Sequence, residues 1–288
     1  MAVQREPGMR TADAPLLTLD ANPTKHGIGT AAQPWLSSLS ELRENPASWR
    51  RNVTSRTAAR LMKFLYALPS VPLSSLTTNT APQEAMITDG ACMPPFCGAR
   101  HDDFSALMGI AFTKQPNVIV ELGTAYGNTV ANLCQICPEA RIFTVNALPE
   151  QITGDSITYA LTKDEIGSAY RNNGLSNRVV QIYCDTLRLN LSPYLSGAGI
   201  DLAIIDACHD PDYVVNDFLK VVPFVAPGGV VLLHDTHPCL RGHLWNSYVG
   251  CMRLRRCGYS IKHITGTWWG VWTAEHPVTQ QPPQHGLR

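Results

Sequence analysis

The chain has 288 residues, 44% of them hydrophobic and 16% charged, and its 23 basic and 23 acidic residues give a formal net charge of +0. This length suits one large α/β domain with an N-terminal extension. The charge balance argues against proteins that coat nucleic acid or a membrane surface, because these usually carry a basic excess. Neither an apolar signal-peptide core nor a run of about 18 apolar residues occurs, so we expect a cytoplasmic protein without a membrane partner.

The N-terminal third differs from the rest of the chain in residue composition and in hydrophobic pattern. Residues 1–33 are rich in Pro, Thr, Gly and Ala without a clear period, and they predict a flexible arm. Residues 34–101 contain helical patterns followed by a stretch dense in turn-forming residues, 69–98. A loop of that length in a compact domain is commonly a lid or a linker, so we expect 34–101 to form a helical and lid region.

Nine cysteines form an odd, scattered set, which suits a reducing compartment better than a disulfide framework. Cys134 and Cys137 spell C-x-x-C. No second pair stands at zinc-site spacing, and both residues fall in an apolar helical stretch. The pattern therefore favours buried packing over a metal or redox role.

From Asp102 onward, apolar strand-like runs alternate with helical patterns, which predicts an α/β domain over 102–275 and a tail over 276–288. We expect a Rossmann-like, doubly wound, mostly parallel sheet of seven strands, with an antiparallel hairpin around Gly266 as its last two strands. Thr162 and Glu165 have the spacing of a capping box. The other five expected strands are 118–122, 141–145, 179–183, 201–206 and 230–234, and the expected helices are 104–114, 128–137, 163–173, 213–222 and 243–256.

The stretch VIVELGTAYGNT, residues 118–129, would form the first strand-to-helix turn, where doubly wound sheets bind their ligands. It lacks the closely spaced glycine pair of G-x-G-x-x-G and the lysine of a P-loop. Glu121, Asp185, Asp206 and Asp235 stand at predicted strand ends and would face one crevice. Four carboxylates would repel a pyrophosphate, so the sequence predicts a site for a cationic ligand.

Four segments in this order resemble the class I S-adenosylmethionine-dependent methyltransferases, especially bacterial-type enzymes that act on small molecules: VIVELGTAYGNTVANL, IFTVNALPE, RVVQIYCDT and IDLAIIDACHDPDYVVNDFLKVVPFVAPGGVVLLHDT. The resemblance covers about residues 102–275. It implies S-adenosylmethionine as the cofactor and a small-molecule acceptor methylated at a hydroxyl oxygen. Relatives are often dimeric or larger, and some hold Mg²⁺, so the resemblance leaves a homo-oligomer and a metal open for this chain.

Carried over residue by residue, the resemblance implies that the glycine-containing turn approaches the methionine part of the cofactor while Glu121 supports its charged end. Asn146 stands where the family usually has an acid that binds both ribose hydroxyls, and an amide loses that charge-assisted bond. Asp185 would lie beside the adenine, and Asp206 would face the methyl group. The expected cofactor-binding residues are Glu121, Gly123, Thr124, Gly127, Asn128, Asn146, Asp185 and Asp206.

The chemistry of methyl transfer calls for a base that takes a proton from the acceptor. His209 and His234 stand at the ends of adjacent predicted strands, and a histidine titrates near neutral pH. With Asp206 they form the expected catalytic set. As an alternative, Asp206 and Asp235 would hold Mg²⁺, which would lower the pKa of an acceptor hydroxyl; His234 is a poor ligand for such a hard cation.

Three other functions stay open at this point. A nicotinamide-dependent oxidoreductase is disfavoured by the missing glycine pair and the acidic crevice. A binding protein that kept the methyltransferase fold without turnover is suggested by Asn146 and by Ala207, where the family often has glycine. A third reading keeps the cofactor but uses it for a non-methylating reaction such as a cyclisation.

Overall fold

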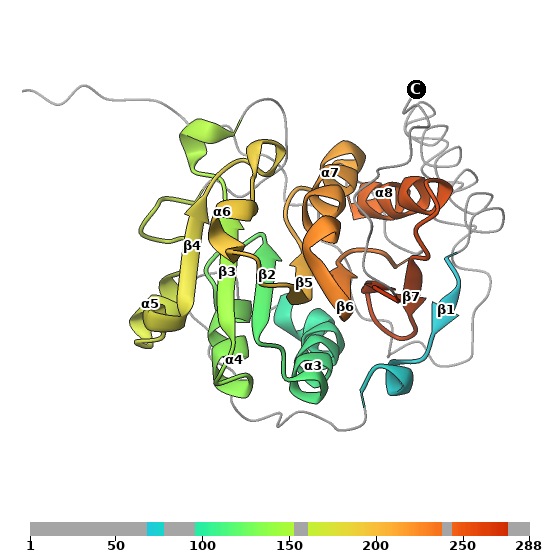
Figure 1. The fold of residues 1–288 in the computed structure, drawn as a ribbon, viewed down its shortest axis with the longest axis horizontal. Helices are drawn as coiled ribbons and strands as arrows, with labels where there is room; N and C mark the ends of the chain where they lie inside the picture. The colour runs from blue at the N-terminus through green and yellow to red at the C-terminus, as the bar shows by residue number, and fades with distance from the viewer. Residues whose placement is uncertain (1–67, 78–95, 153–160, 238–243, 276–288) are drawn as a thin grey trace, which may run out of the picture.

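The computed structural model describes residues 68–77, 96–152, 161–237 and 244–275. The predicted arm and tail lie outside these residues, as does most of the predicted 34–101 region. The described part forms one eight-stranded sheet with the order β1-β7-β8-β6-β5-β2-β3-β4 (Figure 1). The predicted Rossmann-like, mostly parallel α/β architecture is confirmed.

Five consecutive parallel strands make up most of the sheet, up to the edge strand β4: β2 (Val118–Leu122), β3 (Arg141–Asn146), β4 (Val179–Tyr183), β5 (Ile200–Ile205) and β6 (Val225–Leu233). The chain runs outward from β2 through β3 to β4, and then returns to place β5 on the other side of β2. Strand order therefore reverses between β2 and β5, which is where ligands bind in doubly wound sheets.

The predicted C-terminal hairpin consists of β7 (Lys262–Ile264) and β8 (Gly270–Thr273), and β8 also pairs antiparallel with β6. The sheet has eight strands, one more than expected, because β1 (Ser70–Val71) pairs in parallel with β7. A strand of two residues is too short to show the alternation by which strands are recognised in a sequence.

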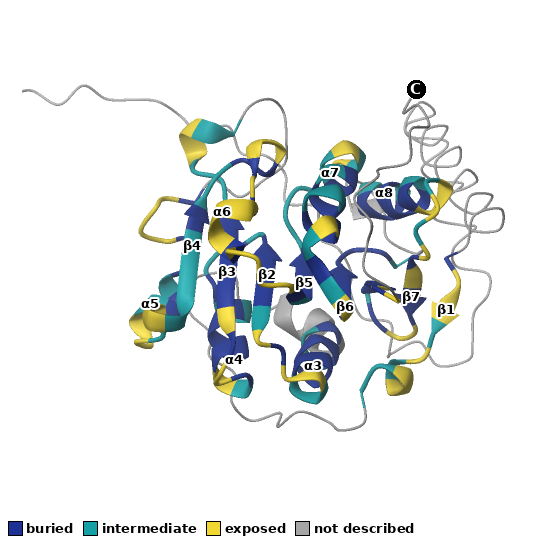
Figure 2. Ribbon diagram, in the orientation of Figure 1, coloured by how far each residue is buried: buried dark blue, intermediate teal, exposed yellow. Residues whose placement is uncertain are grey.

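Helices cover both faces of the sheet, and the strands between them are mostly buried (Figure 2). On one face pack α7 (Pro211–Val221) and α8 (Leu244–Arg256), together with the short α6 (Ser192–Leu195). The other face carries α3 (Phe96–Lys114), α4 (Asn128–Ile136) and α5 (Ser168–Asn172). No described helix has the combination of length and apolar character that crossing a bilayer requires.

The helix predicted for 163–173 is shorter than expected. The backbone N–H and the hydroxyl of Thr162 both donate to the Glu165 carboxylate at 2.8 Å, so the predicted capping contact forms. Gly167, with a left-handed φ of 73°, separates this turn from α5, which begins only at Ser168. The capping pair therefore closes an isolated turn and does not start the helix.

The C-x-x-C pair lies at the end of α4, where both thiols are buried and unoxidised. The Cys137 thiol donates to the carbonyl oxygen of Ala111. Burial, followed by the neighbouring Cys134, raises the pKa of the Cys137 thiol to about 11. Reactive cysteines have a lowered pKa and are partly exposed, so the prediction of buried packing is confirmed.

Candidate active site

A cleft opens at the carboxyl ends of β2, β3, β4 and β5, beside the point where strand order reverses. The space within it, counted out to its open mouth, is about 710 Å³. Four of the residues expected to bind the cofactor line it: Gly123, Asn146, Asp185 and Asp206.

Apolar side chains that the sequence analysis did not single out complete the cleft. Ile152 and Leu161 form part of its wall, and Tyr213 of α7 lies beside Asp185. These residues stand in connecting segments or on a helix, away from the strand-end motifs.

The glycines of the β2–α4 turn serve the packing of the backbone. Gly123 has a φ of 108°, and a Cβ there would lie 2.1 Å from the carbonyl oxygen of Asp206. Gly127 has a φ of 79°, and a Cβ there would lie 2.8 Å from the Cα of Gly167. Only Gly123 borders the cleft, so Gly127 and the following Asn128 shape the turn and the start of α4 from outside it.

Asn146 holds this turn in place from the end of β3. Its Oδ1 accepts the backbone N–H of Ala125 at 3.1 Å, and its Nδ2 donates to the carbonyl oxygen of Ala147 at 2.8 Å. Ala125 has a left-handed φ of 46°, which is uncommon for a residue with a Cβ. The amide thus stabilises a strained turn at the edge of the cleft.

Glu121 lies behind the cleft instead of lining it. Only 2% of the residue is exposed, and the hydroxyl of Thr144 donates to its carboxylate at 2.6 Å. Burial raises the pKa of the Glu121 carboxyl to about 8, with Thr144 lowering it and Asp206 raising it. The hydroxyl of Thr124 points to Thr144 at 2.7 Å, also away from the cleft.

Asp235 lies fully buried at the end of β6, with a left-handed φ of 56°. The expectation that four acids face one crevice is therefore wrong for two of them: Asp185 and Asp206 line the cleft, while Glu121 and Asp235 are enclosed. The position of these acids at strand ends correctly predicted that they lie at one edge of the sheet. It did not predict how far each side chain is buried.

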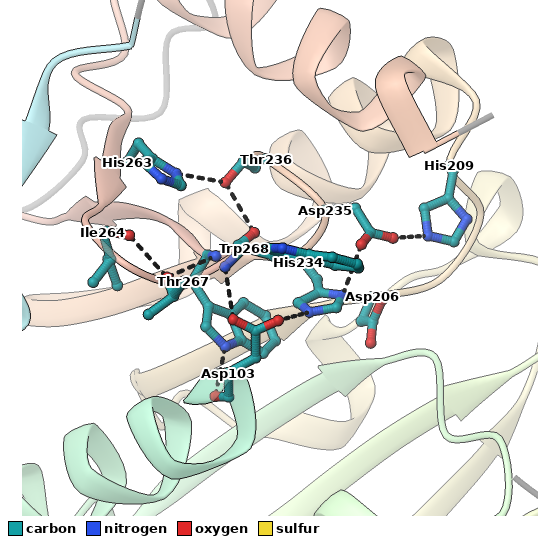
Figure 3. Close-up of polar contacts among 11 residues, drawn as sticks. Asp103, Asp206, His209, His234, Asp235, Thr236, His263, Ile264, Thr267 and Trp268 are labelled. Atoms are coloured by element: carbon teal, nitrogen blue, oxygen red, sulfur yellow. Dashed lines mark hydrogen bonds and ion pairs between the residues drawn. The ribbon is translucent and has the colours of Figure 1, made fainter. Parts of the chain in front are cut away.

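A cluster of charged side chains surrounds Asp235 (Figure 3). On one side, Nε2 of His209 contacts the Asp235 carboxylate, and the His209 side chain keeps 23% of its surface exposed. On the other side lies His234, with only 4% of its side chain exposed. Its Nδ1 is 3.2 Å from Oδ1 of Asp206 and 3.4 Å from Oδ1 of Asp235.

The opposite nitrogen of His234, Nε2, is 3.4 Å from Oδ2 of Asp103 on α3. Burial lowers the pKa of His234, but the carboxylates of Asp206, Asp103 and Asp235 outweigh that effect and raise it to about 10. His234 is therefore an imidazolium at neutral pH, which cannot accept a further proton. Of the two candidate bases, only His209 combines partial exposure with a carboxylate partner.

Asp103 was not singled out in the sequence, although it connects α3 to both the hairpin and the charged cluster. Its carboxylate accepts the backbone N–H of Trp268 at 2.7 Å, and its carbonyl oxygen accepts the indole N–H of Trp269 at 2.8 Å. The signal that could have revealed it is an acidic residue on the apolar stripe of α3, beside Leu107 and Ile110. A buried acid on such a stripe requires a partner.

Asp206, His209 and Asp235 bring one ligand atom each to within 4.8 Å of one another, so the structure places the two expected metal ligands together. The donor set does not fit Mg²⁺, which prefers oxygen ligands, because one donor is a nitrogen. The His234 imidazolium also lies against both carboxylates. This arrangement compensates the acids without a metal ion.

Comparison with known proteins gives one family match. Residues 120–236 match the model of a family described as a methyltransferase domain. A protein of Sinorhizobium fredii (strain NBRC 101917 / NGR234), the uncharacterized protein y4gI, is 25% identical over 188 residues, which are 65% of this chain and 18% of that protein. The chain thus spans less than a fifth of that relative's length.

Two solved structures show weaker resemblance. The O-methyltransferase TomG from Streptomyces achromogenes, in complex with SAM, is 18% identical with a TM-score of 0.44, covering 60% of this chain and 79% of that one. The O-methyltransferase from Bacillus cereus, in complex with SAH, is 13% identical with a TM-score of 0.43, covering 65% and 83%. At such scores these resemblances add nothing to the assignment of function.

The segment that matches the family runs from β2 through the end of β6. It contains the β2–α4 turn, the strand ends that border the cleft, and the cluster around Asp235. Over this segment the chain is therefore similar to a methyltransferase domain, carried on a Rossmann-like sheet.

Proposed function

We propose that the protein transfers a methyl group from S-adenosylmethionine to a hydroxyl oxygen of a small-molecule acceptor. The observation that carries this proposal is the pairing of partly exposed His209 with buried Asp235 beside cleft-lining Asp206, within a methyltransferase domain. A base held by a carboxylate is the group that methylation of a hydroxyl requires.

The residues that line the cleft suit the proposed cofactor in charge and in apolar surface. Gly123 and Asn146 border its β2 and β3 side, and Asp185 and Asp206 supply two carboxylates that favour a positively charged ligand. Ile152 and Leu161 give it apolar surface, which suits the adenine ring. Gly127, Asn128 and Thr124 act indirectly, since they set the shape of the turn.

S-adenosylmethionine supplies an electrophilic methyl group whose leaving group, the neutral thioether, takes the electron pair of the breaking C–S bond. In this proposal His209 accepts the proton from the acceptor hydroxyl, and Asp235 stabilises the imidazolium that results. His234 is a positioning residue that holds Asp206 and Asp235 in place. Correct alignment alone can contribute roughly 7 to 11 kcal/mol to lowering the barrier.

No step of this mechanism requires a metal ion. The carboxylates of Asp206 and Asp235 that would bind Mg²⁺ already contact the side chains of His234 and His209. A homo-oligomer and a cytoplasmic location remain predictions from the sequence.

Isothermal titration with S-adenosylhomocysteine tests the cofactor, with NADH as the control. Saturable binding of S-adenosylhomocysteine and no heat with NADH are expected. The reverse result would support the oxidoreductase.

Incubation with S-adenosylmethionine labelled in the methyl group, together with a panel of small phenols and catechols, then tests methyl transfer. Binding without any labelled product from the panel or from a metabolite extract would point to the non-catalytic protein.

The His209→Gln variant tests the base. We expect turnover to fall by about 10² to 10⁴-fold while the affinity for S-adenosylhomocysteine stays unchanged. The Arg188→Gln variant changes a residue of the 3-10 helix η4 (Thr186–Arg188) outside the catalytic cluster and serves as the matched control. Equal turnover in His209→Gln and the control would remove His209 from the mechanism.

A further inference from the structure

A chain of hydrogen-bonded polar side chains, buried except for the half-buried Gln181, runs behind the cleft from α5 to Glu121 in β2. The hydroxyl of Tyr170 donates to Oε1 of Gln181 at 3.0 Å, and Nε2 of Gln181 donates to the hydroxyl of Thr124 at 3.0 Å. The hydroxyls of Thr124 and Thr144 are 2.7 Å apart, and Thr144 donates to Glu121 at 2.6 Å. Two members of the chain adjoin the cleft in sequence: Gly123 precedes Thr124, Val145 follows Thr144, and both of these neighbours line the cleft.

Gln181 fixes the direction in which protons point along this chain. Its Nε2 also donates to the backbone oxygen of Thr144 at 3.2 Å, and a carbonyl oxygen can only accept. The amide nitrogen therefore faces the two threonines. Because Thr124 accepts from Gln181 and the single proton of Thr144 goes to Glu121, Thr124 donates to Thr144. Every donor in the chain points toward the Glu121 carboxylate.

This arrangement is costly for a structure that needs only a packed sheet. Thr144 is fully buried, Thr124 is 3% exposed and Glu121 is 2% exposed. Their neighbours in β2 and β3 are apolar residues such as Ile119, Val120 and Val145, which pack without any polar partner. A buried carboxyl group with a relay of oriented donors indicates a function for its charge.

We propose that Thr144 is a positioning residue for cofactor binding, which orients Glu121 and supplies the donor that favours its carboxylate form when a positively charged ligand occupies the cleft. This inference rests on the proposed function. In the unliganded protein, burial raises the pKa of Glu121 to about 8, opposed by the Thr144 hydroxyl and reinforced by Asp206. A cationic ligand acts in the same direction as Thr144, so the two effects support each other.

Two substitutions at Thr144 separate this role from simple packing. Thr144→Val keeps the volume and the branching but removes the hydroxyl, whereas Thr144→Ser keeps the hydroxyl and removes a methyl group. The positioning role predicts that Thr144→Val weakens S-adenosylhomocysteine binding by ~10-fold and that Thr144→Ser restores it to within ~2-fold of wild type. A packing role predicts the opposite order. Thr267→Val, which removes another buried hydroxyl in the β7–β8 turn, is the matched control and should bind normally.

The same titrations in a Glu121→Gln background complete a double-mutant cycle. If Thr144 acts through Glu121, Thr144→Val should have no further effect on affinity there. Gln181→Met removes the donor one step earlier and should weaken binding by ~3-fold, so it decides the question if Thr144→Val fails to fold. Wild-type protein that does not bind S-adenosylhomocysteine overturns the proposed function. Normal binding by Thr144→Val or, in its absence, by Gln181→Met overturns only this inference.

Discussion

Replacement of His234 should lower the stability of the fold strongly. Its imidazolium lies among three carboxylates, at 3.2 Å from Asp206 and 3.4 Å from both Asp103 and Asp235. His234→Gln keeps a side chain of similar reach that can form hydrogen bonds but removes the positive charge. Three acids would then face one another in a site where His234 and Asp235 have almost no contact with water.

The magnitude follows from the burial of this cluster. Removing one partner of a buried ion pair costs about 3 to 5 kcal/mol, because the remaining charge is left without compensation. A domain of this size loses about 2 to 4 °C in Tm per kcal/mol, so the variant should melt roughly 6 to 20 °C below wild type. Since domains are stable by only about 5 to 15 kcal/mol, the loss should be plain in a urea titration.

The effect should depend on pH with a definite sign. The pKa of His234 in the folded protein is raised to about 10 from its ordinary value of 6.5, because the carboxylates of Asp206, Asp103 and Asp235 outweigh the effect of burial. A raised pKa means that the folded protein holds the proton more tightly, so its contribution is complete below about pH 6.5 and is lost as the pH rises through 10. The difference in unfolding free energy between wild type and His234→Gln should therefore shrink from pH 7 to pH 10.

Urea denaturation at pH 7 and pH 10 measures both quantities. The double variant Asp103→Asn/His234→Gln should recover part of the loss, because it removes one of the three charges. His263→Gln is the matched control: burial, and next the nearby His237, lower the pKa of His263 to about 4, so this buried histidine is neutral at both pH values. A loss under about 1 kcal/mol at pH 7, or a loss that is equal at pH 10, would refute the reasoning.

Three further predictions concern the cleft. Gly123→Ala should abolish S-adenosylhomocysteine binding or folding, whereas Gly258→Ala, with φ of 94° but no atom within 4 Å of a Cβ, should only lower the Tm slightly; equal effects would contradict this. Asn146→Asp should tighten S-adenosylhomocysteine binding by ~10-fold in titrations through a charge-assisted bond to ribose, and weaker binding would argue otherwise. Methyl transfer should survive EDTA; a loss reversed by Mn²⁺ or Mg²⁺ would restore the metal hypothesis.

The sheet was the most predictable feature, and its predictability has a physical cause. The strands of a parallel sheet are buried on both faces, so they appear in the sequence as continuous apolar runs bounded by turns. β2 and β4 match the expected ranges at both ends, and the other three parallel strands of this set differ mainly at their ends. The helix expected over 163–173 failed because Gly167 breaks a pattern whose first turn was correctly recognised.

The position of the site was predictable from the sequence, but the burial of its individual side chains was not. Parallel strands bring their carboxyl ends to one edge, so Asn146, Asp185 and Asp206 could be placed beside a common cleft from the sequence. What separates His209 from His234 is tertiary: Asp103 on α3 and the hairpin that carries Trp268 enclose His234, and Trp268 is 165 residues from Asp103 along the chain. No local pattern contains that contact.

Similar acids at the edge of one sheet thus acquire different properties from their partners. Asp206 lines the cleft and contacts the His234 imidazolium. Asp235 is buried against His209. Burial raises the pKa of Glu121 to about 8. The proposed preference for a cationic ligand therefore depends first on Asp185 and Asp206. In the same proposal it depends next on Glu121, whose carboxylate form at neutral pH is favoured by the bound ligand and by Thr144 against the cost of its burial.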